Sequence, residues 1–362
     1  MNRRFAALAL VLLATSCTGR NLVSAGFAIS NGVTWLPGSD ESQTTTLAGS
    51  CSVFGDTGHI ECDGLVIRVD TPGVFNGIGW QESAPSQPTC AGTATPAPKI
   101  AVFSFGSLVV APSATVNLVP NGSGPTSTID AIALVAADRI EVDGTIAAQQ
   151  PTMWVGGLPA SQSDPVLGVA PGVWSMPGTQ PGASGAGGAT AGGAGGGGGP
   201  AGAAAVPPQV EPMCFGSMGG WIGDGSSETG GDVSGFGGLG GAAVLLAAAN
   251  EVRVDGTIDA DGQPGRAIAL GSSGPGGGSG GTILLEAPTI GGSGSITARG
   301  GAGGDGADSV GGAGGGASAP GDGGAGQQAG GGGGGAGFIR VRTSTCGSTW
   351  SGFVPAPACA TL

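Results

Sequence analysis

The stretch of sequence that decides the fold is AVLLAAANEVRVDGTIDADG, residues 243–262. It opens with an apolar run and passes through a corner of small residues to an alternating strand at 252–254. Asp255-Gly256 then predicts a tight corner, because Gly accepts positive φ and Asp caps turns. A third short strand follows at 257–258. Alternation of apolar and other side chains is typical of strands with one buried face.

The same order of strand, corner and strand recurs along the chain. VDGTI occurs at both 142–146 and 254–258, and the copies are AIALVAADRIEVDGTIAA (131–148), TILLEAPTIGGSGSITARGG (282–301), a looser AVFSFGSLVVAPSATVNLVPNG (101–122) and a truncated GAGFIRVRT (335–343). One copy cannot bury its apolar face alone, whereas stacked copies build a continuous core. Copies separated by long connections pair in parallel. We therefore predict an all-β chain folded as a parallel β-helix, a solenoid with three short strands per coil. A β-sandwich is the alternative.

Glycine-rich tracts separate the copies, at about 149–241, 263–281 and 300–337. Because the spacing between copies is irregular, we expect these tracts to be insertions from one corner of the coil. In the last tract glycine recurs at most third positions counted from Gly300, which is the period of polyproline II. This period is compatible with a packed polyglycine-II-like loop, and the composition is equally compatible with a flexible loop.

The repeats also predict the domain organisation. We expect the glycine-rich β-helix over 100–343. Residues 17–99 do not match the repeat, and we interpret them as a tether and a small N-terminal β cap, since the ends of solenoids need covering. Residues 344–362 are expected to form a C-terminal tail.

Composition excludes several classes of protein. The formal net charge of −13 excludes a basic nucleic-acid-binding surface, so no nucleic-acid partner is expected. Hydrophobic residues make up 40% of the chain and cluster in short runs, which argues against disorder throughout. Proline is nearly absent from the last glycine-rich tract, so a collagen helix is a poor fit.

The N-terminus predicts export. MNRRFAALALVLLATSC has two arginines, an apolar stretch at 5–13 and small residues before Cys17, the order of a signal peptide over 1–16. The apolar stretch is far shorter than the roughly 20 residues that span a bilayer. The segment resembles the lipobox of bacterial lipoproteins, although Leu13 lies one place further from the cysteine than usual. Ordinary signal-peptide cleavage is the alternative.

The lipoprotein resemblance implies a location and one partner. Cys17 would carry the lipid, including palmitate, and membrane lipid would be the partner of this anchor. Thr18 follows the cysteine, and by resemblance to lipoprotein sorting this implies an outer-membrane lipoprotein on the cell surface or the periplasmic face.

The remaining cysteines predict disulfide bonds. Six are left, an even number typical of exported proteins: Cys51, Cys62, Cys90, Cys214, Cys346 and Cys359. Six cysteines allow 15 pairings, so the sequence does not determine the connectivity. Proximity favours Cys51–Cys62 and Cys346–Cys359, which leaves Cys90–Cys214. A metal site is disfavoured, because the chain has no C-x-x-C and a single histidine, His59.

Calcium is the only cofactor for which the sequence offers candidates, and none is expected to be required. Asp305 and Asp308 lie in GGDGADSV, one match to a calcium nonapeptide whose sites need successive repeats. Asp259 and Asp261 have part of the spacing of a calcium loop, but Ile268 stands where that loop needs a glutamate. Turn capping by these aspartates is the favoured interpretation.

The apolar strand, VDGTI-like corner and glycine-rich tract together are similar to Gly-rich β-helical surface proteins, including haemagglutinin-like adhesins. The resemblance implies a non-enzymatic surface protein, structural or adhesive, with cell-surface polysaccharide or another surface protein as partner. The shared motif is structural, so no catalytic residue carries over. The alternative is a carbohydrate-active enzyme, a polysaccharide lyase or hydrolase, which needs converging carboxylates on one coil face. The charged side chains expected to point outward are sparse: Glu141, Arg253, Glu286 and Arg299.

Overall fold

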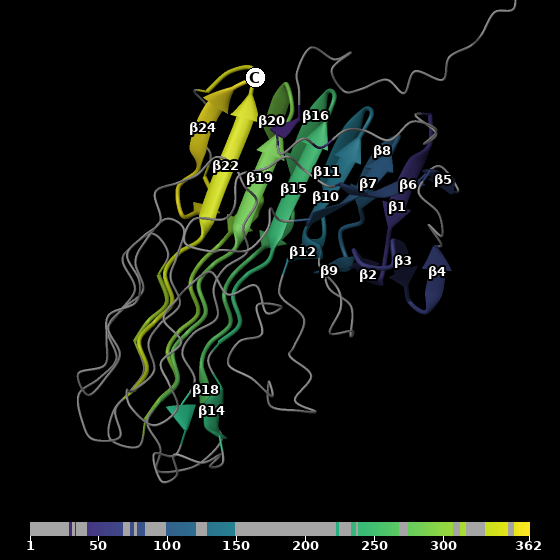
Figure 1. The fold of residues 1–362 in the computed structure, drawn as a ribbon. Coiled ribbons are helices and arrows are strands. Elements are labelled where there is room, and N and C mark those ends of the chain that lie inside the picture. Colours follow the sequence, from purple (N-terminus) through teal and green to yellow (C-terminus); the bar gives the residue numbers. More distant parts are fainter. Residues whose placement is uncertain are drawn as a thin grey trace, which may run out of the picture.

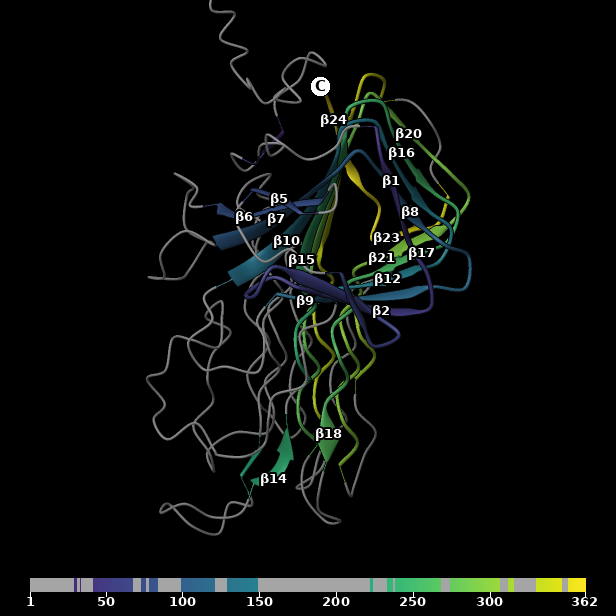
Figure 2. The ribbon, with the colours of Figure 1, turned by 90° about the vertical axis from the view of Figure 1, so that its right-hand side faces the viewer.

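The computed structural model describes residues 29–30, 33, 42–67, 73–75, 78–83, 99–120, 129–148, 222–223, 233–236, 238–267, 274–306, 312–315, 330–346 and 351–362. Regular structure in these residues is almost entirely β-strand, which confirms the all-β class. The strands form three large sheets, here called sheets A, B and C, and one small sheet (Figures 1 and 2).

Strand order in the sheets repeats along the chain. Sheet A has five strands, in the order β1 (Thr44–Leu47), β8 (Ser107–Val110), β11 (Arg139–Val142), β16 (Glu251–Val254) and β20 (Thr289–Gly291). Sheet B has eight, in the order β23 (Phe353–Val354), β21 (Ser295–Thr297), β17 (Thr257–Asp259), β12 (Thr145–Ala147), β9 (Thr115–Val119), β2 (Ser50–Phe54), β3 (His59–Cys62) and β4 (Leu65–Ile67).

Sheet C also has eight strands, in the order β24 (Ala358–Thr361), β22 (Phe338–Thr343), β19 (Thr282–Glu286), β15 (Ala243–Ala248), β10 (Ile129–Ala136), β7 (Lys99–Phe105), β6 (Ile78–Ser83) and β5 (Gly73–Phe75). The small sheet is antiparallel, in the order β13 (Ile222–Gly223), β14 (Val233–Phe236) and β18 (Arg266–Ala267).

Each full copy of the repeat supplies one strand to each large sheet. The copies 131–148 and 243–262 pair in parallel in all three sheets, through β10 with β15, β11 with β16 and β12 with β17. The register matches the sequence alignment, because Val142 lies opposite Val254 and Ile146 opposite Ile258. The predicted parallel pairing of the copies is therefore confirmed.

The N-terminal region contributes more than a cap. The strands β1 and β2, whose sequences do not match the repeat, pair in parallel with β8 and β9 and so extend sheets A and B. Antiparallel strands follow, with β3 and β4 at the edge of sheet B and β5 and β6 at the edge of sheet C. At the other end of the molecule, β23 and β24 of the C-terminal tail add parallel strands to sheets B and C.

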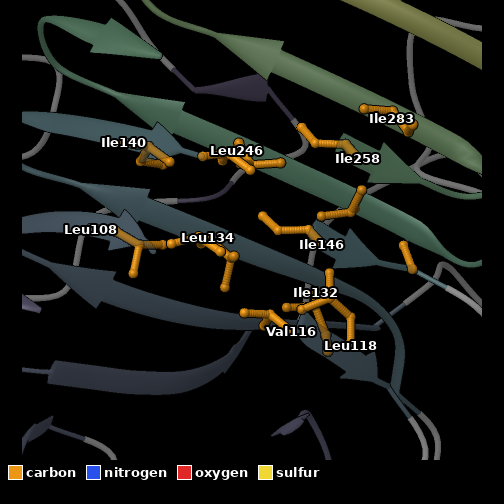
Figure 3. Packing of buried hydrophobic residues seen from close by; sticks show 14 of the residues in the cluster. Leu108, Val116, Leu118, Ile132, Leu134, Ile140, Ile146, Leu246, Ile258 and Ile283 are labelled. Atoms are coloured by element: carbon orange, nitrogen blue, oxygen red, sulfur yellow. The ribbon is translucent and has the colours of Figure 1, made fainter. Parts of the chain in front are cut away.

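The main core lies between the three sheets. Inward side chains from successive copies stack on one another, as Figure 3 shows for Leu108, Val116, Leu118, Ile132, Leu134, Ile140, Ile146, Leu246, Ile258 and Ile283. The alternation predicted for β11 is present, since Ile140 and Val142 are fully buried and Glu141 is half-buried. Burial of each large aliphatic side chain contributes roughly 1.5–3 kcal/mol before entropy costs.

The middle strands of sheet C are buried on both faces. Its outer face carries a second apolar cluster: Ile29, Val33, Ile100, Val102, Ala131, Ala133, Val135, Ala243, Leu245, Ala247, Ala249 and Leu284. The continuous apolar runs at 131–136 in β10 and 243–248 in β15 follow from this, because a strand buried on both faces needs no polar alternation.

Two disulfide bonds hold the ends of the described structure. Cys51–Cys62 joins β2 to β3, and Cys346–Cys359 joins the segment after β22 to β24. These are the two pairs that sequence proximity favours. Cys90 and Cys214 lie outside the described residues.

Candidate functional site: a bundle of glycine-rich segments

Glycine-rich segments from separate parts of the chain lie side by side at one end of the sheets (Figures 1 and 2). We call this set the glycine bundle, and its described segments are 238–242, 260–265, 274–281, 298–306, 312–315 and 330–337. These segments connect sheet B to sheet C, because they follow β12, β17 and β21 and precede β15, β19 and β22. All of the described insertions therefore emerge between the same two sheets.

Backbone hydrogen bonds join the segments at every third residue. Gly238 N–H donates to the Gly276 carbonyl and Gly241 N–H to the Ser279 carbonyl, both at 2.9 Å. Between 300–303 and 312–315 the same three-residue step appears in antiparallel sense. This is the period of the polyproline-II helix, which makes no hydrogen bonds within itself and so leaves its backbone groups for neighbours.

Segment 274–281 is in the middle of this network. Its Gly277 N–H donates to the Gly332 carbonyl at 3.0 Å, and the next residue, Gly278, donates to the Gln263 carbonyl at 3.0 Å. Its Pro275 carbonyl accepts from a further segment, that of 298–306. Successive residues thus bond to different neighbours, so the described tracts are packed rather than independent loops.

Glycine is required in the bundle because the backbones approach too closely for a side chain. A Cβ added at Gly277 would lie 2.0 Å from the carbonyl oxygen of Gly301, and one at Gly331 would lie 2.0 Å from that of Pro275. Separations under 3.0 Å force the backbone to shift. The bundle therefore depends on glycine for close backbone approach.

Side chains appear where a segment faces outward. Along 298–306 the exposed residues are Arg299, Ala302 and Asp305, again at every third position, whereas Gly301 and Gly303 between them are buried. This row forms an outer edge of the bundle with short and charged side chains. The row holds three of the five exposed residues of the described bundle, the others being Pro264 and Ala313.

The aspartates at the base of the bundle bond to the backbone. Asp259 Oδ1 accepts from the Asp261 N–H at 2.8 Å, and Asp261 Oδ1 accepts from the Arg299 N–H at 2.5 Å. Burial raises the pKa of Asp261, while the hydrogen bond from Arg299 acts in the opposite direction. Both carboxylates thus cap neighbouring backbone, the role that the sequence favoured over a calcium loop.

The match to the calcium nonapeptide, GGDGADSV, begins near the C-terminal end of segment 298–306. Asp305 is exposed, and Asp308 lies outside the described residues. Where the structure describes the chain, no group of three or more His, Cys, Asp and Glu side chains is arranged to hold a metal ion.

One corner of the copies carries a charged pair. Arg253 contacts Asp255 at 2.5 Å, and Asp255 Oδ1 accepts from both the N–H and the hydroxyl of Ser293, at 2.9 and 3.0 Å. These hydrogen bonds, the backbone one first, lower the pKa of Asp255. The pair thus joins the corner of one copy to that of the next.

The burial of the Glu286 side chain differs from what the sequence predicts. The side chain was expected to point outward beside Glu141, Arg253 and Arg299, and it does lie on the outer face of sheet C, but it is completely buried. Its carboxylate pairs with Arg342 at 3.0 Å and accepts from the backbone N–H of Ser30 at 2.9 Å. The residues that cover it come from the far N-terminal part of the chain, which alternation within a strand cannot reveal.

The lipidation candidate, Cys17, lies outside the described residues. No helix in the described ranges is both long and apolar enough to cross a bilayer. Comparison of the chain with protein-family models, with curated proteins and with solved structures finds no match.

Proposed function

We propose that the parallel parts of the three large sheets are the faces of one parallel β-helix, and that this solenoid is the rigid body of a lipid-anchored surface protein with a structural or adhesive role. The observation that carries the proposal is the glycine bundle, which projects from one end of a stack of strands paired copy by copy (Figure 2). A rigid body with one projecting element fits a protein that presents a surface to a partner. It fits less well an enzyme, which needs a concave site for its substrate.

The chemistry of the bundle supports an adhesive role. Its outer row presents a short side chain, that of Ala302, between two charged ones, those of Arg299 and Asp305. The short side chain allows a partner to approach closely and to hydrogen-bond to the charged groups on either side. A cell-surface polysaccharide, rich in hydroxyl donors and acceptors, fits such a surface, and another surface protein is the second candidate partner.

Export and anchoring are supported by the N-terminal sequence and by the disulfides. Two described disulfides suit an oxidising compartment, where such bonds form and persist. The lipobox resemblance at Cys17 supplies the anchor, and Thr18 supports the outer membrane.

The anchor is tested by mass spectrometry of the mature N-terminus, together with labelling of intact cells. We expect an acylated Cys17 at the N-terminus, and we expect Cys17→Ala to move the protein from the membrane to the soluble fraction. A mature chain that starts at another residue without lipid would overturn the anchor.

The adhesive role is tested with purified protein on immobilised surface polysaccharides and outer-membrane proteins. We expect Ala302→Trp, which places a bulky group in the outer row, to weaken binding at least about tenfold, a change of roughly 1.4 kcal/mol. Thr145→Trp on sheet B is the control and should leave binding unchanged. Progressive shortening of the polysaccharide during the assay would instead support the enzymatic alternative.

A further inference from the structure

The outer face of sheet C is covered in part by Ile29, Ser30 and Val33. Ile29 and Val33 are only 7% and 3% exposed, and both belong to the apolar cluster that includes Leu245 and Leu284. The Val33 N–H donates to the Ser30 carbonyl at 3.3 Å, and the Ile29 and Val33 side chains both pack on the sheet. We call Ile29, Ser30 and Val33 the strap.

A buried carboxylate fixes the strap in place. Ser30 donates to Glu286 from its backbone N–H, at 2.9 Å, and also from its hydroxyl. Arg342 on the adjacent strand completes the site at 3.0 Å. A buried carboxylate is costly unless it is paired and hydrogen-bonded, so the strap and Glu286 stabilise each other.

The strap and the glycine bundle are at opposite ends of the same strand. Gly281 of the bundle immediately precedes β19, and Glu286 is the last residue of β19. In Figure 1 the β15, β19 and β22 arrows all point away from the bundle. The strap therefore lies at the end of sheet C remote from the bundle.

We propose that the strap fastens the N-terminal tether to sheet C and thereby holds the glycine bundle pointing away from the membrane. This orientation rests on the proposed anchor at Cys17. The stretch from Cys17 to Ile29 spans at most about 40 Å even when fully extended, so the strapped end is held near the bilayer. Without the strap, the tether would leave the body free to tumble about the anchor.

The strap itself is tested by hydrogen exchange of the full-length protein in detergent micelles. We expect amides of the strap to be protected in the wild type, and Ser30→Ala or Glu286→Gln to reduce this protection about ten- to a hundredfold, as expected for loss of a bond to a charged group. Exchange of β15 should stay the same in Ser30→Ala, which shows that the variant is folded. Ser52→Ala on sheet B is the matched control.

The orientation is tested on lipid vesicles by energy transfer from a single dye to acceptors in the bilayer. A dye at Ser344→Cys, exposed just after β22, should transfer more than a dye at Ala302→Cys in the bundle. Ser30→Ala should reduce this difference. Equal or reversed transfer in the strapped protein would overturn the orientation.

These outcomes separate the strap from the anchor. Protected strap amides in the unlipidated Cys17→Ala protein would support the strap whether or not the wild type carries lipid. Strap amides that exchange at the unprotected rate, or that are unaffected by both substitutions, would overturn the strap even in a lipidated protein.

Discussion

The Asn250 side-chain amide donates a hydrogen bond to the Asp138 carboxylate at 2.8 Å, although the two residues are 112 positions apart. Each stands at the corner after the first strand of its copy, and the Asn250 backbone N–H also donates to the Asp138 carbonyl at 2.9 Å. Adjacent copies are therefore aligned at their corners as well as along their strands. The long insertion between them does not disturb this register.

Stacking of isoleucines in sheet B gives the first prediction. Ile258 is fully buried and lies in register between Ile146 and Ile296. Ile258→Ala should lower the free energy of unfolding by about 2–5 kcal/mol, because it removes buried atoms and leaves a cavity. Denaturant unfolding followed by circular dichroism measures the loss.

The matched control is the preceding residue, Thr257, whose side chain is half-buried. Thr257→Ala should change the free energy of unfolding by less than about 0.5 kcal/mol, as expected of a surface position. Similar losses in both variants would contradict an inward Ile258 and an outward Thr257.

Local repetition explains why much of the fold was predictable. VDGTI marks the same corner in two copies, and the alternation around it identifies the inward residues. As a result, the sequence predicted both the parallel pairing and the register of Val142 with Val254. The segment 44–54 was missed as a continuation of sheets A and B because it lacks this motif, although its strands make the same kind of parallel pairs.

Contacts distant in sequence explain what was not predictable. Ser30 and Glu286 are 256 positions apart, and nothing local to either residue indicates the other. One signal was available, because the uninterrupted apolar run 131–136 within β10 indicates a strand buried on both faces. The three-residue glycine period was visible, but the sequence could not show which segments bond to each other.

Close packing in the glycine bundle gives the second prediction. Gly277→Ala should open the bundle, since the new methyl group would lie 2.0 Å from the Gly301 carbonyl oxygen. We expect faster amide exchange across 274–281 and 298–306, with little change in the core strands. Hydrogen exchange with peptide resolution measures this directly.

Gly291 provides the control for that substitution, because a Cβ there would meet nothing within 4 Å. Gly291→Ala should be neutral, or stabilising by about 0.4–1 kcal/mol through the unfolded chain. A bundle that tolerates Gly277→Ala as well as Gly291→Ala would not be packed as described.

The C-terminal disulfide gives the third prediction. Cys346–Cys359 closes a loop with a sequence separation of 13 and holds β24 on the edge of sheet C. Replacing both cysteines with alanine should lower the free energy of unfolding by about 3 kcal/mol or less, since loop closure in the unfolded chain is lost. Thermal unfolding measures the change. The increase in amide exchange should be largest in β24 and absent from β10, and a uniform increase would contradict a local role.

The last prediction concerns pH. Hydrogen bonds from Ser293 and the ion pair with Arg253 lower the pKa of Asp255 below its ordinary value of 3.8. A carboxyl with a lowered folded-state pKa stabilises the fold above its ordinary pKa, and this contribution is lost as the pH falls through the lowered value. Asp255→Asn should therefore be less stable than the wild type at neutral pH, and the difference should shrink in acid. Denaturant unfolding at several pH values measures it.

Ser293→Ala separates the hydrogen bonds from the ion pair. It removes the hydroxyl donor to Asp255 but keeps the backbone donor, which is the largest cause of the lowered pKa. Its loss of stability should therefore be smaller than that of Asp255→Asn and should have the same pH dependence. A loss in Asp255→Asn that is equal at neutral and acid pH would mean that the asparagine disturbs packing, and that the ionised carboxylate does not join the two corners.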